Sequence, residues 1–232
     1  ASIKMQLMQF ASDRKVSDMS FYERKAAYEW VNEHFTIINN NQVYSYSDII
    51  LFMEKILLQQ PVDGVFIDPY NSLKLDMKGS NIGVHDYHYE SASSFLTFSK
   101  ANNIAVWLNT HAFTEAQRRK GPDGLPVAPY AEDTEGGGKF VNRADCFLTI
   151  HRKVQSPDHN IRKLSELHVR KVRETETGGY PTPIEDPFRM VMNSSQTGFI
   201  SWLKKKPLFK SIHFQSDKQE AINFSSILSS NN

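Results

Sequence analysis

Two short, almost uninterrupted apolar runs constrain the fold of this chain more than any other feature. They are VFI within residues 62–68 and IAVWL within residues 104–110, and polar residues follow each run. A strand covered on both faces by other elements reads this way, as in the parallel sheet of an α/β protein. We therefore expect the two runs to be strands of one parallel sheet with helices on its faces.

Helices and strands alternate along the rest of the chain in the order that such a sheet requires. Apolar residues at helical spacing predict one or two helices within residues 2–33, one from Ser45 or Ser47 up to Pro61, and one over 85–103. Further strands are predicted over residues 35–38, 145–151, 167–173, 188–193 and 198–202. Because the last three follow one another without helices, we expect antiparallel strands at the carboxyl-terminal edge of the sheet.

Composition limits what the chain can bind and where it works. With 232 residues and a net charge of +1, it has the size of one domain and no overall field toward nucleic acid or membranes. No apolar stretch reaches the roughly 20 residues of a membrane span, so no membrane partner is expected. The single cysteine, Cys146, is expected to be a small buried residue of a strand, and the compartment to be reducing, hence cytoplasmic. Residues 1–203 are predicted to form the core, and 204–232 a basic, then Ser- and Asn-rich tail.

Polar side chains follow both apolar runs. Asp68 closes the first run before Pro69, and Asn109, Thr110 and His111 close the second. Ligands of open α/β sheets bind beyond the carboxyl ends of the strands, where a carboxylate suits Mg²⁺ and a histidine can bind a phosphate. The structural alternatives are a turn cap for Asp68 and a loop hydrogen bond for His111.

The segment EGGGKFVNRAD, residues 135–145, places three glycines before a predicted short helix. The amides of Gly136 and Gly137 could bind a phosphate, although a flexible turn explains the glycines equally well. The spacing GxxxxGK[ST] of a P-loop occurs nowhere in the sequence. The phosphate-binding loop of a nucleotide site is therefore missing from this chain.

Two groups of cations are candidates for contacts with phosphates. Strand alternation in LHVRKVR puts Lys171 and Arg173 on one face, where they could stabilise a transferring phosphoryl group or simply protect a sheet edge. The long segment from 112 to 135 is a candidate substrate loop, and its cations suit the backbone of single-stranded nucleic acid unless they are merely solvated. The candidate nucleic-acid contacts are Arg118, Arg119, Lys120 and, after the glycines, Lys139.

Four blocks in this order resemble the RecA-like core of hexameric replicative helicases, especially the Twinkle-like and phage primase-helicase branch. VFIDPYNSL is similar to the Walker B strand and AVWLNTHAF to the sensor strand of that family. EGGGKFVNRADCFLTIHR and LHVRKVRETETGG resemble the glycine block and the strand with the Lys-x-Arg pair. The resemblance spans about residues 35–202 and implies a RecA-like parallel sheet flanked by helices.

The resemblance also implies roles for single residues. Asp68 would order Mg²⁺, Asn109 and the glycines would contact ATP or another NTP, and His111 would couple the γ-phosphate to the DNA loop. Lys171 and Arg173 would act on the nucleotide of a neighbouring subunit, with Arg173 as the finger. Loops 71–84 and 112–135 would face single-stranded DNA in the channel of a homo-oligomer, typically a hexameric ring.

The Walker A strand and the catalytic glutamate of the family would lie upstream of Ala1. We therefore expect this chain to be the carboxyl-terminal part of an ATP-dependent DNA helicase and to be inactive alone. Two alternatives remain open from the sequence. The chain could belong to a RecA-like ATPase of recombination, plasmid replication or regulation, or it could be a non-catalytic nucleic-acid-binding remnant of that fold.

Overall fold

A computed structural model describes residues 2–38, 42–76, 83–134 and 136–214 of the chain. The chain forms two compact units. Residues 39–188 make up one, which carries most of the predicted site, and residues 1–38 with 189–232 make up the other. Parts of the predicted loop 71–84 and of the predicted tail, residues 77–82 and 215–232, lie outside the described residues.

The two apolar runs form the predicted parallel strands. Strand β1 (Gly64–Ile67) pairs with β2 (Ala105–Leu108), with Val65 opposite Val106 and Phe66 opposite Trp107. Parallel neighbours need a long crossover, and α4 (Val84–Asn102) provides it. The parallel α/β core predicted from the sequence is thus present.

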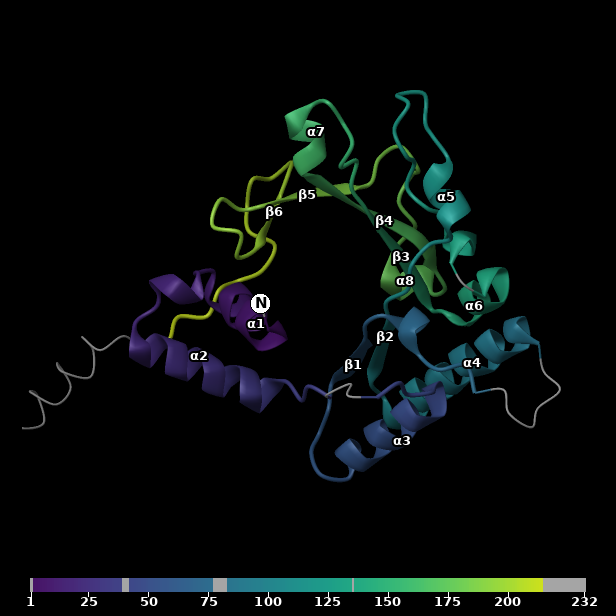
Figure 1. Ribbon diagram of the computed structural model, residues 1–232, viewed down its shortest axis with the longest axis horizontal. Coiled ribbons are helices and arrows are strands. Elements are labelled where there is room, and N and C mark those ends of the chain that lie inside the picture. Colours follow the sequence, from purple (N-terminus) through teal and green to yellow (C-terminus); the bar gives the residue numbers. More distant parts are fainter. Residues whose placement is uncertain (1, 39–41, 77–82, 135, 215–232) are drawn as a thin grey trace, which may run out of the picture. The chain divides into compact units, whose positions relative to one another are not determined.

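Helices cover one face of these strands. Figure 1 shows α3 (Tyr46–Leu57) and α4 beside β1 and β2. The buried residues that join these elements are Met53, Ile67, Tyr70, Ala92, Phe95, Phe98, Ile104 and Phe140. Helix α3 begins with a capping box in which Ser45 accepts from the amide of Asp48, and the carboxylate of Asp48 accepts from the amide of Ser45.

The opposite face of β1 and β2 differs from the prediction. Phe66 and Trp107 are neighbours across the strands, and they are 66% and 52% exposed. The expectation that these strands are covered on both faces is therefore wrong for this chain. An apolar run cannot by itself distinguish a strand with two covered faces from one whose second face is left open.

An antiparallel hairpin follows in the same unit. Strand β3 (Cys146–His151) pairs with β4 (Leu164–Val172), and Thr149 lies opposite His168. The short helices around the hairpin are α5 (Thr114–Arg118), α6 (Gly137–Arg143), α7 (His159–Lys163) and α8 (Thr175–Gly178), and two 3₁₀ turns cover Tyr70–Ser72 and Ala131–Asp133. The predicted antiparallel pairing is confirmed, but Cys146 is exposed rather than buried.

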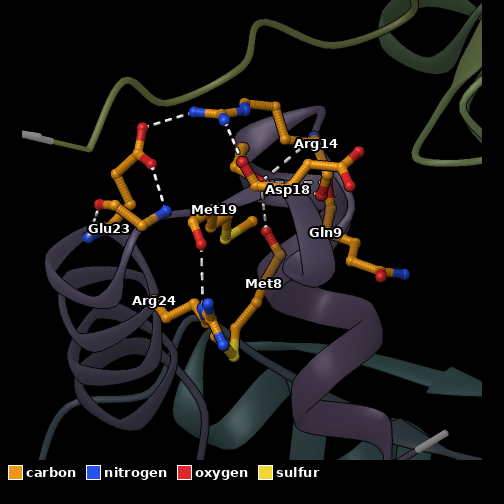
Figure 2. Close-up of polar contacts among 9 residues, drawn as sticks. Met8, Gln9, Arg14, Asp18, Met19, Glu23 and Arg24 are labelled. Atoms are coloured by element: carbon orange, nitrogen blue, oxygen red, sulfur yellow. Dashed lines mark hydrogen bonds and ion pairs between the residues drawn. The ribbon is translucent and has the colours of Figure 1, made fainter.

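The other unit pairs two amino-terminal helices with a small hairpin. Helices α1 (Ile3–Ser12) and α2 (Phe21–His34) are joined through the 3₁₀ turn Val16–Asp18. Figure 2 shows Arg14 at this corner, where it binds the carboxylate of Glu23 and the carbonyl of Asp18. Strand β5 (Phe188–Met192) pairs antiparallel with β6 (Phe199–Ser201).

The β-branched segment at residues 35–38 is not a strand, contrary to the prediction. Strand propensity takes effect only when a segment joins a sheet, and this segment belongs to neither sheet of the described residues. Among the residues described, no helix has both the length and the apolarity needed to cross a bilayer.

Candidate functional site

The carboxyl ends of β1 and β2 bring the predicted acid and amide together. The side-chain amide of Asn109 donates to the carboxylate of Asp68, and both residues are exposed. Backbone bonds continue the strand pairing around them: the amide of Asn109 donates to Ile67 at 2.9 Å, and the amide of Tyr70 donates to the carbonyl of Asn109 at 2.7 Å. This pairing fixes Asp68 at the edge of the sheet where α/β proteins bind ligands.

Asn71 organises the second half of this edge. Its side-chain oxygen accepts from the Thr110 hydroxyl and from the His111 amide, each at 2.8 Å. The hydroxyl of Thr134 donates to Thr110 at 3.0 Å and so connects the far end of loop 112–135 to the same edge. Sequence reasoning missed Asn71 because an asparagine after a strand usually serves a turn. Its position in the DPYN turn was the available signal.

The exposed carboxylate of Asp68 fits a magnesium site that is completed by other ligands. Mg²⁺ often binds one or two protein carboxylates and takes its remaining oxygen ligands from water and phosphates. In the part of the chain that the structure covers, no group of three or more His, Cys, Asp or Glu side chains could hold a metal ion. Asp68 therefore suits a metal that arrives with a nucleotide better than a preformed metal cage.

The predicted glycine turn has a clear packing role. Gly136 is buried with φ at +83°, and a Cβ built there would lie 2.9 Å from the Cβ of His88 on α4. Gly137 also has a positive φ, +54°, at the start of α6. These conformations suit glycine and bring α6 close to α4. Phosphate binding by Gly136 and Gly137 stays a prediction.

Lys171 and Arg173 lie on one face of β4, as strand alternation predicts. Lys171 Nζ donates to the Val141 carbonyl at 2.8 Å, and Arg173 Nη2 donates to the Asn142 carbonyl at 2.9 Å. The last carbonyls of a helix lack partners within it and attract cations, so both side chains cap the end of α6. Burial lowers the pKa of Lys171, and the nearby Arg173 lowers it further.

Loop 112–135 is folded onto itself. The Gly121 amide donates to the Leu125 carbonyl at 2.8 Å, and the Val127 amide donates to the Arg119 carbonyl at 3.0 Å. Arg119 forms an ion pair with Asp133 within the loop. The structure therefore separates the three predicted cations: Arg118 and Lys120 are exposed, while Arg119 is used to hold the loop together.

Lys139 is also engaged within the chain. It forms an ion pair with Asp86, although both side chains remain at least half exposed. The hydrogen bond from Lys139 lowers the pKa of Asp86. A DNA contact by Lys139 would have to replace this exposed pair, which contributes little to stability.

Comparison with known proteins identifies the fold. The sequence is 26% identical over 169 residues to a protein of Arabidopsis thaliana named "Twinkle homolog protein, chloroplastic/mitochondrial", and the match covers 71% of this chain and 22% of the relative. The structure resembles a solved helicase ATPase domain with a TM-score of 0.64 and 13% identity, covering 85% of this chain and 69% of that one. The chain has the RecA-like fold of a helicase ATPase core.

A second solved structure with the same RecA-like fold is a DnaB-like replicative helicase, described together with its interactions with primase. It gives a TM-score of 0.61 at 13% identity and covers 84% of this chain and 46% of that one. No family model matches the sequence. The chain spans about a fifth of the length of the curated relative, whose printed name places that relative in chloroplasts and mitochondria. The cytoplasmic location stays a prediction for this chain.

Proposed function

We propose that this chain is the carboxyl-terminal part of the ATPase core of a replicative DNA helicase of the primase-helicase type. It would couple NTP hydrolysis at subunit boundaries to movement along single-stranded DNA. The proposal is supported by the RecA-like fold and by the similarity to the Twinkle homolog. The observation that carries it is the placement of Asp68, Asn109 and His111 at the ends of two adjacent parallel strands.

At this edge Asp68 would bind the magnesium ion of Mg–ATP, directly or through water. The metal, when bound, neutralises charge on the phosphate oxygens. Asn109 holds one oxygen of Asp68 through its amide and thereby sets the direction of the other. The exposed His111 begins loop 112–135, and Asn71 fixes its backbone. A contact between His111 and the γ-phosphate would therefore reach the loop through one residue.

Arg173 would complete the site of a neighbouring subunit in a homo-oligomeric, typically hexameric, ring. Its side chain is 31% exposed and lies on the surface of its own chain. An arginine supplied across a boundary stabilises the charge of a transferring phosphoryl group, an effect of about 10³–10⁵ in rate. The predicted role of Lys171 is more demanding, because its ammonium group is bonded to the Val141 carbonyl.

The decisive experiment uses a longer protein in which this chain is joined to a segment that supplies the P-loop. We expect single-stranded DNA to stimulate its ATP hydrolysis and Asp68→Asn to reduce kcat about 10²-fold or more. Asp63→Asn is the matched control, because Asp63 is an exposed carboxylate just before the same strand. Equal activities of the two variants would remove Asp68 from the metal site.

The exposed loop cations favour a second candidate, a nucleic-acid-binding module without catalysis. This candidate needs only Arg118 and Lys120, both exposed, and no P-loop. Replacing both with alanine should weaken binding of single-stranded DNA and lower the slope of log K against log salt by about 0.7 for each lost phosphate contact. DNA binding without ATP hydrolysis in the longer protein would favour this candidate. An unchanged slope would place the loop away from DNA.

A further inference from the structure

Arg170 connects the predicted finger strand to the predicted DNA loop. From β4, its Nε donates to the Pro129 carbonyl at 3.1 Å and its Nη2 donates to the Ala128 carbonyl at 3.2 Å. Its guanidinium also lies 5.2 Å from the centre of the Tyr130 ring. We propose that Arg170 is a positioning residue that sets the geometry of loop 112–135 for DNA binding, an inference that rests on the proposed function.

The loop sequence explains why an anchoring side chain is needed. Pro126 and Pro129 have no amide proton, so the returning half of the loop cannot form a regular ladder with a strand. Its carbonyls still need donors when they are covered. Arg170 supplies two of these donors, and His151 Nε2 lies 3.1 Å from the Pro126 carbonyl. The loop is thus held on the hairpin by side chains rather than by backbone pairing.

Tyr130 extends the anchor to the outgoing half of the loop. The guanidinium of Arg119 lies 4.9 Å from the same ring, and Arg119 also pairs with Asp133. The Tyr130 amide donates to the Asp133 carboxylate at 2.6 Å. Arg170 therefore contacts a cluster that joins both halves of the loop, next in sequence to the exposed Arg118 and Lys120.

Strand alternation gives this anchor a functional consequence. Arg170 lies on one face of β4 and holds the loop, whereas Lys171 and Arg173 lie on the other face and hold the end of α6. A displacement of the loop by DNA would act on the strand that carries the predicted finger. The planar fork of arginine is required, because lysine keeps the charge but cannot bind two carbonyls and stack in this geometry.

Hydrogen exchange on this chain tests the anchor directly. In Arg170→Lys we expect the Val127 amide, which is bonded to Arg119, to exchange about tenfold faster than in the parent chain. Arg162→Lys on α7 is the control, because Arg162 is an exposed arginine outside the loop. Unchanged exchange at Val127 in Arg170→Lys would overturn the proposal, whatever the function of the protein.

Binding of a dT oligonucleotide separates positioning from direct contact. We expect Arg170→Lys and Arg170→Gln to weaken binding several-fold while the slope of log K against log salt stays that of the parent chain. A slope lower by about 0.7 in Arg170→Gln would show that Arg170 itself contacts a phosphate and would contradict the positioning role. Parent-like affinity in both variants would also contradict it. If the parent chain binds no DNA, the proposed function fails, while the exchange measurement still decides whether Arg170 holds the loop.

Discussion

Arg173 and Asp145 are joined twice within one chain. Arg173 Nη1 lies 2.7 Å from a carboxylate oxygen of Asp145, and the Arg173 amide donates to the Asp145 carbonyl at 2.8 Å. The carboxylate is half exposed, so the side-chain pair is screened by water and weak. A phosphate of a neighbouring subunit could therefore compete for the guanidinium while the backbone bond keeps the strand in place.

The first prediction concerns this guanidinium in the longer protein with a P-loop. We expect Arg173→Ala to lower DNA-stimulated ATP hydrolysis about 10³-fold or more while nucleotide affinity stays within about twofold, because the finger acts on the transition state. Turnover and nucleotide binding are measured separately. Asp145→Asn is the companion variant and should keep activity, since it removes only the competing partner. Weaker nucleotide binding with unchanged turnover per bound nucleotide would argue against a finger.

The second prediction concerns the glycine turn. Gly136→Ala should lower the free energy of unfolding by about 1–3 kcal/mol, because alanine is strained at a positive φ and its Cβ would meet His88. Gly138→Ala is the matched control: it lies in α6 with no heavy atom within 4 Å of a built Cβ. That change should leave stability equal or raise it by up to about 1 kcal/mol. Denaturant unfolding measures both, and equal effects would refute the packing role of Gly136.

The third prediction is a pH dependence of stability near neutrality. Burial lowers the pKa of His151 below its ordinary value of 6.5, although the Pro126 carbonyl and Glu166 partly oppose the shift. Between the folded and the unfolded pKa the unfolded chain binds more protons, so stability rises with pH. The free energy of unfolding should fall as pH drops through about 6.5 and level off below the folded pKa.

His151→Gln should flatten this dependence, since an amide can still donate to the Pro126 carbonyl but does not titrate. His159→Gln, at an exposed position on α7, is the control and should keep the slope of the parent chain. Urea unfolding measured between about pH 5 and 8 gives the comparison. Identical slopes in His151→Gln and the parent chain would show that another group causes the dependence.

The fourth prediction distinguishes the two serines that the sequence offers as caps of α3. Ser45 accepts from the Asp48 amide at 3.3 Å and is buried, whereas Ser47 is exposed in the first turn. Ser45→Ala should cost about 1 kcal/mol of unfolding free energy, and Ser47→Ala less than about 0.5 kcal/mol. Thermal or denaturant unfolding measures the difference. A larger loss in Ser47→Ala would contradict the assignment of the cap.

The sequence predicted the parts of the fold that depend on local pattern. The parallel strands ending at Asp68 and Asn109, the long helix between them and the hairpin with Lys171 all follow from apolar periodicity and turn residues. Alternation along β4 also placed Lys171 and Arg173 on one face, although their carbonyl partners on α6 could not be read from spacing.

The features that the sequence could not predict depend on contacts between distant residues. Asn71 is bonded to Thr110 and His111, about forty positions away, and no pattern around Asn71 announces this. Arg118 and Arg119 are adjacent and chemically alike, yet the structure pairs Arg119 with Asp133 and leaves Arg118 exposed. The exposure of Cys146 and the irregular backbone of residues 35–38 likewise depend on which neighbours are present, not on local propensity.

The aromatic pair Phe66 and Trp107 has a consequence for handling the isolated chain. Two large rings side by side on an uncovered strand surface offer any second molecule a sticky patch. Concentrated solutions should therefore form reversible clusters, and serine at both positions should suppress them. The indole of Trp107 would also report, by a blue-shifted emission, whenever another polypeptide shelters it from water.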